Sequence, residues 1–434
     1  MANHVDAVPQ RTIVDGHVST VKPAPKAFTD LLWVVVPEMD PHVPLGPCQW
    51  GAIHGTALPA RGAAVQVGFG EGDIPRVLWW EGKGNNVKEW GAKGDGVTDD
   101  TEAIQGAIAT GQKVVFPPSS GAYITSNPLV IDKLKSVGLQ GLAGSAAVGS
   151  MPTIRYTPSD GRPIISAKLT QGLELKGLKI EAGSATYTGP MIDFNPGESA
   201  RVSSLAVVEN NWFAGGVGTS CGIHATSLIN GSIQNNQFQT MKYGIVGWDG
   251  SAGIGPTNVI AIRGNGFSEM GTAAIVNMQQ GVVIENNTFE PLASGAICPI
   301  ARTGEVASGP YASAVAAGVL QEANVISGNW WGDVTGAGSF ALGGLYSGVT
   351  VTGNLFDSGA KQPTNFIQLA GGTRGVAILG NHFGGSNAEA SNAINGLAAG
   401  IVGVLISGNT FIGSALIKIA NEGNITELVK TANG

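Results

Sequence analysis

The sequence predicts an all-β chain in which a small β-barrel precedes a parallel β-helix with one capping helix at its start. Three observations support this prediction: 66 of the 434 residues are glycine, only 13% are charged, and a strand motif recurs through the C-terminal two-thirds. Glycine and low charge favour short strands joined by tight turns, and a hydrophobic share of 43% is enough for a large core. A disordered chain would show the opposite balance of charge and hydrophobicity.

The recurring motif is a short alternating apolar strand, followed by Asn or Gly, then Asn, any residue and an aromatic residue. Its asparagines are Asn211, Asn236, Asn265, Asn287, Asn329, Asn354, Asn381 and Asn409. Their residue numbers differ by 25, 29, 22, 42, 25, 27 and 28. The interval of 42 is either one turn with a long loop or two turns, one of which lacks the motif.

A repeat of this length cannot bury its apolar face alone, so it must stack on its neighbours. In a parallel coil, equivalent positions lie ~4.8 Å apart, which turns a recurring asparagine into a ladder of side-chain amides. Asparagine also tolerates the left-handed conformation of a sharp corner, and the aromatic residue two positions later falls on the same face and stacks inside the coil. A leucine-rich repeat or a β-propeller fits less well, because leucine spacing, helical segments and a regular 40-residue period are missing.

The segment before the array, residues 87–131, reads as strand, tight turn, helix and strand. Gly94-Asp95-Gly96 is turn chemistry, and the spacing of Asp99 and Glu102 is that of a capping box for a helix over residues 99–110. The carboxylates of Asp95, Asp99 and Asp100 are interpreted as turn and cap groups in preference to a metal or acid–base cluster.

This segment, GAKGDGVTDDTEAIQGAI followed by VVFPPSSGAYITS, resembles the entry segment of the pectate-lyase and polygalacturonase-like β-helix superfamily, as used in phage tailspikes. The resemblance implies a right-handed β-helix over residues 87–434, whose first coil the helix within 87–131 covers. PPSSGAY replaces the usual PPGxY of that family, which is a small insertion in the turn.

Residues 12–83 contain alternating strands with Gly and Pro turns, which suit a small barrel. The run LPARGAAVQVGF at 58–69, with VVVPE at 34–38, resembles the OB-like domain of phage baseplate and injection-system spike proteins. That resemblance implies a module that docks to other tail proteins and does not read nucleic acid. Residues 1–11 are then a tail and 84–86 a linker.

Composition narrows the functional classes further. The net charge is −7 and no Lys/Arg cluster is present, which argues against nucleic-acid binding. The three cysteines lack disulfide or metal-ligand spacing, and we expect neither a metal nor another cofactor. No signal peptide and no membrane span are recognisable, so we expect synthesis in a cytoplasm. The resemblance to phage tail proteins implies that this is the host cytoplasm and that the protein has a place in the virion.

Candidate site residues follow the recurring aromatic residue. Glu290 and Asp357 come directly after it, and Glu269 and Asp333 come two positions after it. Glycoside hydrolysis uses two carboxyl groups ~5 to 9.5 Å apart, which neighbouring coils can supply. Trp330 is a candidate sugar platform, since the adjacent Trp331 takes the core position. The alternative for these carboxylates is a solvated turn.

The sequence therefore predicts a tailspike or minor tail protein that presents a β-helix to a host cell-surface glycan. Through the resemblance alone, we expect a homotrimer. A tailspike depolymerase is the first alternative, and a free polysaccharide lyase or hydrolase is the second. Few acidic pairs occur in the array, which favours a structural or adhesive role over glycoside hydrolase or lyase activity.

Overall fold

The computed structural model describes residues 13–22, 31–35, 42, 45–50, 64–69, 75–80, 85–142, 151–194, 202–216, 218–247, 257–276, 278–290, 298–301, 320–332, 340–357, 365–384, 392–396, 399–412 and 417–431. The chain divides into two compact units, Met1–Gly84 and Asn85–Gly434. Each unit is described by itself.

The first unit contains a closed barrel of five strands in the order β1-β2-β3-β5-β4. Its pairs are antiparallel except β3 with β5, which is parallel. Closure leaves no unpaired strand edge. The strands are β1 Ile13–Lys22, β2 Leu31–Val35, β3 Leu45–Trp50, β4 Ala64–Phe69 and β5 Pro75–Trp80.

The second unit begins with the short 3-10 helix η2 Val87–Trp90 and the helix α1 Thr101–Ile108. One face of α1 is apolar, and Ile104, Ala107 and Ile108 on it are fully buried in the core. The capping box expected from Asp99 and Glu102 does not form. The N-cap is Asp100 and makes no side-chain cap bond, because its carboxylate accepts instead from the backbone N–H groups of residues 93 and 94.

The other carboxylates of this segment also hold the turn. Asp95 accepts from Val97 N, Thr98 N and the Thr98 hydroxyl, and these bonds, those from Thr98 first, lower the pKa of Asp95 to about 2. Asp99 accepts from the backbone and hydroxyl of Thr101 and from the Ser126 hydroxyl at 2.5 Å. Within the described residues, no group of three or more His, Cys, Asp or Glu side chains is placed to hold a metal ion.

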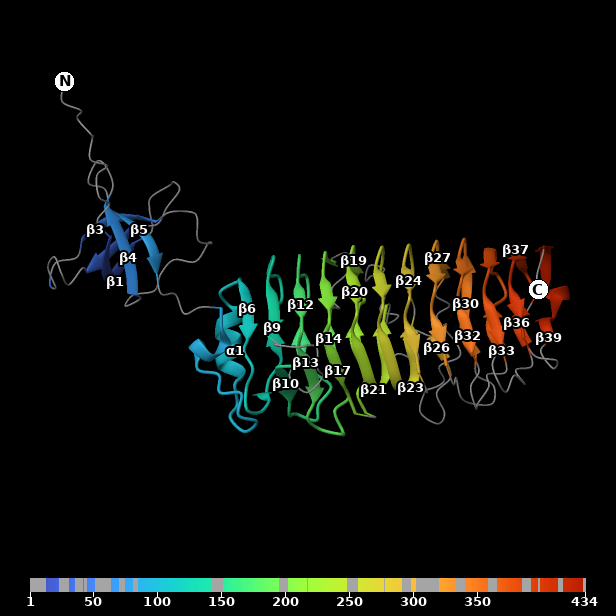
Figure 1. Ribbon diagram of the computed structural model, residues 1–434, viewed down its shortest axis with the longest axis horizontal. Coiled ribbons are helices and arrows are strands. Elements are labelled where there is room, and N and C mark those ends of the chain that lie inside the picture. The colour runs from blue at the N-terminus through green and yellow to red at the C-terminus, as the bar shows by residue number, and fades with distance from the viewer. Residues whose placement is uncertain are drawn as a thin grey trace, which may run out of the picture. The chain divides into compact units, whose positions relative to one another are not determined.

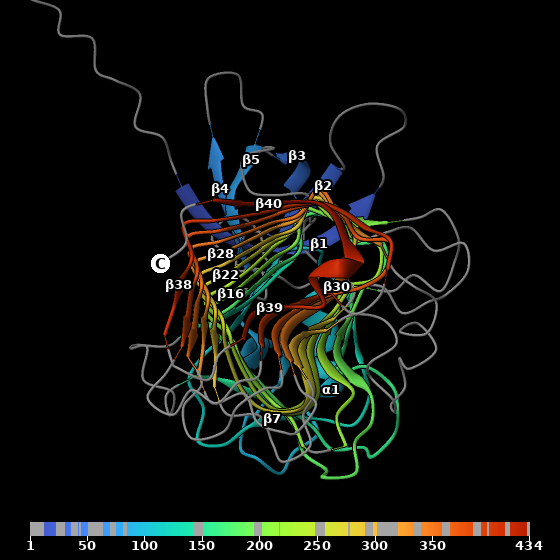
Figure 2. The same ribbon diagram turned by 90° about the vertical axis from the view of Figure 1, so that its right-hand side faces the viewer.

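The rest of the second unit is a parallel β-solenoid of the right-handed type (Figures 1 and 2). Three strand rows repeat along it. The first row, before the recurring asparagines, pairs in parallel from coil to coil. It comprises β6 Lys113–Phe116, β9 Gly138–Gly141, β12 Glu174–Lys176, β16 Val207–Glu209, β20 Ser232–Gln234, β22 Ala261–Arg263, β24 Val283–Glu285, β28 Val325–Ser327, β31 Thr350–Thr352, β34 Arg374–Leu379, β37 Ile401–Ser407 and β40 Ile425–Thr431.

The second row follows the asparagines, and two of its strands, β21 and β23, run on into the third row. It comprises β7 Tyr123–Thr125, β10 Thr153–Tyr156, β13 Lys179–Ala182, β17 Trp212–Ala214, β21 Gln237–Val246, β23 Gly266–Val276, β25 Thr288–Phe289, β29 Trp330–Trp331, β32 Leu355–Asp357, β35 His382–Gly384 and β38 Thr410–Phe411.

The third row completes each turn. It comprises β8 Leu129–Val130, β11 Ile165–Ser166, β14 Pro190–Asp193, β18 Cys221–His224, β26 Cys298–Ala301, β30 Phe340–Ser347, β33 Asn365–Leu369, β36 Asn392–Gly396 and β39 Ile417–Ala420. Shorter elements join the rows: β15 Ser203–Ser204, β19 Leu228–Ile229, β27 Leu320–Glu322 and the 3-10 helix η4 Glu422–Asn424.

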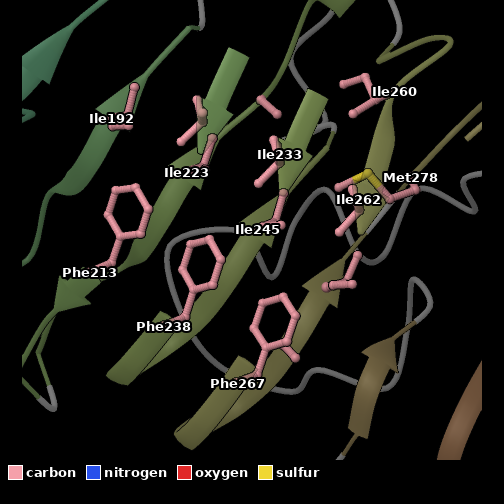
Figure 3. Close-up of a cluster of buried hydrophobic side chains, with 14 of the residues drawn as sticks. Ile192, Phe213, Ile223, Ile233, Phe238, Ile245, Ile260, Ile262, Phe267 and Met278 are labelled. Carbon is pink, nitrogen blue, oxygen red and sulfur yellow. The ribbon is translucent and has the colours of Figure 1, made fainter. Parts of the chain in front are cut away.

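The core contains a column of aromatic rings from the second row. Neighbouring rings lie 4.5 to 5.3 Å apart and within 19° of parallel. Figure 3 shows three of them, Phe213, Phe238 and Phe267, beside isoleucines of the other rows. The parallel register dictates this stacking, because it places equivalent residues of successive coils one strand spacing apart. The column is Phe213, Phe238, Phe267, Phe289, Trp331, Phe356, Phe383 and Phe411.

The eight recurring asparagines form one continuous buried ladder. In each step, the backbone N–H and the side-chain Nδ2 of one asparagine donate to Oδ1 of the next, as from Asn354 to Asn381 at 3.0 and 2.9 Å. The same Nδ2 also donates to a first-row carbonyl, for example that of Ile326 at 2.9 Å. The ladder begins at Asn211, because Leu178 occupies the equivalent position in the preceding coil.

The left-handed conformation lies one residue earlier than the sequence suggested. The residue before each ladder asparagine has φ between 54 and 66°, and the ladder asparagines themselves do not adopt positive φ. This explains the Asn-or-Gly preference at the first motif position. The eight residues are Asn210, Asn235, Gly264, Asn286, Gly328, Gly353, Gly380 and Gly408.

The interval of 42 residues is a single turn. The Asn287 side chain donates to Asn329 Oδ1 at 3.0 Å, and β24 pairs directly with β28. The extra residues therefore lie in an insertion between two stacked coils. In the described residues, no helix is long and apolar enough to cross a membrane.

Candidate functional site

The outward side of the second row carries the candidate site. Strand alternation points the aromatic column inward and the residues on either side of it outward. Phe289 pairs with Trp331, which pairs with Phe356. The next residues, Glu290, Gly332 and Asp357, therefore form one outward column, and the Gly332 N–H donates to the Phe289 carbonyl at 3.0 Å.

Two carboxylates in this column flank a glycine. Glu290 is exposed and Asp357 is half-buried. Two strand spacings separate their Cα atoms, which corresponds to ~9.6 Å. Because the residue between them is Gly332, the column has a slot without a side chain at its centre.

The Trp330 indole fills that slot. A Cβ atom added to Gly332 would lie 2.8 Å from both Cζ2 and Cη2 of Trp330, so the six-membered ring lies directly over the glycine. The Trp330 side chain nevertheless keeps a solvent-exposed surface, with 37% exposure of the residue. An exposed aromatic ring with a carboxylate on either side is therefore held on a rigid strand.

The neighbouring outward positions extend this surface. Trp330 pairs with Thr288 on one side and with Leu355 on the other, and Leu355 pairs with His382. Leu355 is 38% exposed, and His382 is half-buried. We call Thr288, Glu290, Trp330, Gly332, Leu355 and Asp357 the indole face. Its chemistry suits a sugar ring, which stacks on aromatic rings and donates hydroxyl hydrogen bonds to carboxylates.

The structure thus brings three of the sequence-predicted site residues together. Glu290, Trp330 and Asp357 share the indole face, whereas Asp333 lies outside the described residues. Glu269 is exposed one coil earlier, has a φ of 55° and accepts a hydrogen bond from the Thr240 hydroxyl. The ladder asparagines are buried and hydrogen-bonded, so they are structural.

Sequence reasoning missed a buried polar cluster in the third row. His224 Nδ1 lies 3.0 Å from Asp193 Oδ1, and His224 Nε2 lies 2.8 Å from the Thr226 hydroxyl. Lys168 Nζ lies 3.7 Å from the other Asp193 oxygen. Asp193 and His224 are paired residues of adjacent strands, and both follow an isoleucine. An alignment of strands β14 and β18 in the third row would have predicted this contact, but these strands share no motif by which to align them.

Amide side chains in the last coils form a second short network that was also missed. Asn392 and Asn395 both donate to Asn365 Oδ1, at 2.7 and 3.2 Å, and Asn421 donates to Asn395 at 2.9 Å. These residues also belong to the third row or follow it. These asparagines recur at a regular spacing, but no recurring aromatic residue accompanies them, so they did not stand out as a motif.

Comparisons with known proteins agree with this architecture. Residues 84–298 match the family described as Rhamnogalacturonase A/epimerase, pectate lyase-like. A segment of 88 residues is 36% identical to a probable glucan endo-1,3-beta-glucosidase of Arthroderma benhamiae, and one of 58 residues is 48% identical to the non-secreted LysM effector LysM19 of Penicillium expansum. These matches cover 17% and 10% of this chain, and only 9% and 4% of the two relatives.

Solved structures share the fold at low sequence identity. The A-module of the Azotobacter vinelandii mannuronan C-5 epimerase AlgE4 is 18% identical, with a TM-score of 0.55 over 80% of this chain and 95% of that chain. DFA-IIIase from Arthrobacter chlorophenolicus is 16% identical, with a TM-score of 0.54 over 75% and 83%. The tailspike protein of Acinetobacter baumannii phage AM24 is 13% identical, with a TM-score of 0.50 over 97% and 62%.

These neighbours include a mannuronan epimerase and a phage tailspike, and at such identities the likeness concerns the fold alone. The family match and the observed strand rows agree on that fold. Residues 84–298 are therefore similar to the pectate-lyase-like family, and the β-solenoid fold of the second unit agrees with that similarity.

Proposed function

We propose that this chain is a bacteriophage tail protein, a tailspike or minor tail protein, whose β-helix binds a host cell-surface polysaccharide on the indole face. The observation that supports this most is the exposed Trp330 ring, seated on Gly332 and flanked by two carboxylates. A parallel solenoid repeats its outward positions every ~4.8 Å, which gives an elongated polymer a regular surface to lie along. The phage tailspike among the structures of similar fold is consistent with a place in the virion.

The first unit is proposed as the tail-attachment module. Its five strands close into a barrel, and the motif at 58–69 resembles OB-like domains of phage baseplate and spike proteins. On this proposal, its partners are other tail proteins and nucleic acid is not one of them. The helix α1 is proposed as the cap of the solenoid, since its buried apolar face supplies core contacts at the end where no earlier coil exists.

A homotrimer is proposed on the chemistry of the first row. In the N-terminal coils its outward positions carry ion pairs, Lys176 with Glu209 at 3.4 Å and Arg263 with Glu285 at 3.0 Å. From β28 onward, the two outward columns that contain Val325 and Ser327 carry no charge, and Val325, Leu405 and Val429 in them are exposed apolar residues. Exposed charges remain beside these columns, at Arg374 in β34 and at Lys430 in β40. An uncharged sheet face of this kind favours association with another copy. The positions are Val325, Ser327, Thr350, Thr352, Ala377, Leu379, Leu405, Ser407, Val429 and Thr431.

A depolymerase activity is the second candidate function. Inverting glycoside hydrolases hold their two carboxyl groups ~6.5 to 9.5 Å apart, and the Cα atoms of Glu290 and Asp357 are ~9.6 Å apart. These backbone positions place one carboxylate on each side of the Trp330 ring, which is the arrangement that an acid and a base for a bound sugar require. Release of reducing ends from bound glycan, abolished in Glu290→Gln and Asp357→Asn, would establish this activity.

The binding role is tested with a panel of purified bacterial capsular polysaccharides and O-antigens, immobilised on biosensor tips. We expect at least one glycan to bind, and Trp330→Ala to weaken its binding at least about tenfold, or ~1.4 kcal/mol. Val207→Ala is the matched control, because Val207 is a half-buried outward residue of the first row that lies outside both the indole face and the proposed interface. If no glycan in the panel binds, or if Trp330→Ala binds as well as the wild type, the proposal is wrong.

A further inference from the structure

The indole face has a one-sided charge. Its six residues include two carboxylates, Glu290 and Asp357, and no cation. The outward positions of the next coil are His382 and Gly384, and those of the preceding coil are Gly266 and Ser268. A ligand lying over Trp330 therefore meets negative charge on both sides, along the direction in which the coils stack.

The sequence segments that follow these strands carry no net charge. Residues 291–297 contain no charged residue, residues 333–339 contain only Asp333, and residues 358–364 contain only Lys361. Together with Glu290 and Asp357, the formal charge of this part of the sequence is −2, since Asp333 and Lys361 cancel.

The described cations on the second-row strands lie far from the indole face. Lys242 of β21 lies three coils before the Trp330 coil, which is at least ~14 Å. Lys179 lies 3.2 Å and Arg155 lies 2.7 Å from the carboxylate of Glu181. Lys179 also lies 4.4 Å from the centre of the Trp212 ring. Five strand spacings separate Lys179 from Trp330, or ~24 Å, and a Debye length is ~8 Å at physiological ionic strength. These cations therefore contribute little attraction at the indole face.

We infer that the indole face takes a glycan segment that bears no anionic group: neutral sugars, with N-acetylated sugars included. This inference rests on the proposed glycan-binding function and specifies its substrate class. Hydroxyl groups donate charge-assisted hydrogen bonds to Glu290 and Asp357, and the apolar face of the sugar covers Trp330. A carboxylate, sulfate or phosphate on the sugar bound there meets like charges on either side, and none of the six residues of the indole face is a cation that could pair with it.

The experiment sorts the same glycan panel into polymers with and without anionic groups and measures binding to the wild type in 0.05 M and 0.5 M salt. We expect the glycans that bind in a Trp330-dependent way to be neutral, and their affinity to change less than about threefold with salt, because uncharged ligands are not screened. Anionic glycans of otherwise similar composition should bind at least about tenfold more weakly in low salt.

The double variant Glu290→Gln, Asp357→Asn removes the charge and keeps hydrogen-bonding side chains of similar shape. We expect it to reduce the discrimination between neutral and anionic glycans at least about fivefold, with the larger effect in low salt. Glu102→Gln is the control, because it removes one exposed charge from α1, outside the indole face.

Each outcome leads to a distinct conclusion. If an anionic glycan binds best and Trp330→Ala abolishes its binding, the glycan-binding function stands and the neutral-substrate inference is wrong. If the double variant discriminates as the wild type does, the two carboxylates do not select the ligand and the inference is also wrong. If no glycan of either class binds, the proposed function itself fails.

Discussion

At the scale of single residues, each motif position has a separate physical role. The first position needs positive φ, the second holds the ladder, and the fourth fills the core. The sequence predicted the ladder and the aromatic column because both follow from the spacing alone. It placed the left-handed residue one position too late, since Asn at either motif position is compatible with a sharp turn.

The ladder is tested by Asn354→Ala. Oδ1 of Asn354 accepts two bonds from Asn329, and its Nδ2 donates to Asn381 and to the Ile326 carbonyl. A buried polar partner left unsatisfied costs ~1 to 3 kcal/mol, so we expect a loss of about 3 kcal/mol in the free energy of unfolding. Urea denaturation measures it. Asp357→Ala, which changes an outward residue of β32, should cost under ~0.5 kcal/mol. Equal midpoints for Asn354→Ala and wild type would refute the ladder's contribution.

The left-handed position is tested by two substitutions at Gly353. Its φ is 61°, and a Cβ atom there would have no neighbour within 4 Å, so any cost comes from the backbone and not from crowding. Gly353→Asn should cost under ~0.5 kcal/mol, because Asn takes this position in other coils. Gly353→Val should cost at least ~1 to 2 kcal/mol, because a β-branched residue disfavours positive φ. If the two variants melt at the same temperature, the conformational explanation is wrong.

At the scale of elements, the three rows differ in how well the sequence reveals them. The first and second rows carry the motif and were predictable. The third row lacks a repeated aromatic or asparagine, so neither the Asp193–His224 contact nor the amide network around Asn365 was foreseen. Glu290 and Asp357 lie on either side of Gly332 only because the coils before and after the long insertion stack in register. The sequence did not predict this register, because the interval of 42 residues could have been one turn or two.

The aromatic column is tested where it changes residue type. Trp331 is the only tryptophan in the column, and its buried Nε1 has no hydrogen-bond partner among the described residues. Removing an unsatisfied donor recovers ~1 to 3 kcal/mol, which offsets the smaller ring volume, so Trp331→Phe should cost under ~1.5 kcal/mol. Phe356→Ala should cost ~3 to 5 kcal/mol, because it leaves a cavity between stacked rings. A larger loss in Trp331→Phe than in Phe356→Ala would contradict this account.

At the scale of the whole molecule, the repeat period of the sequence predicts the solenoid fold. The binding partners of the protein depend instead on which side chains lie on its surface, and the repeat period does not predict those. The outward first-row positions illustrate this difference. The two columns that contain Val325 and Ser327 obey one alternation along the entire solenoid. They carry ion pairs toward the N-terminus and no charge from Val325 onward, where Arg374 and Lys430 are exposed charges beside them. The sequence alone did not predict this change in charge along the solenoid, because the strand register determines which residues share a column.

If the chains associate through this uncharged face, the same substitution at two equivalent positions should affect the trimer differently. Leu405 and Val207 lie in the same outward column of the first row, Leu405 in the uncharged part and Val207 among the ion-paired coils. Light scattering after gel filtration should give the wild type three times the 44.1 kDa chain mass. Leu405→Glu should shift it to one chain mass, because burying an unpaired charge in an interface is costly, whereas Val207→Glu should leave the trimer intact. A monomeric wild type would exclude the trimer, and dissociation by Val207→Glu alone would place the interface on the charged coils instead.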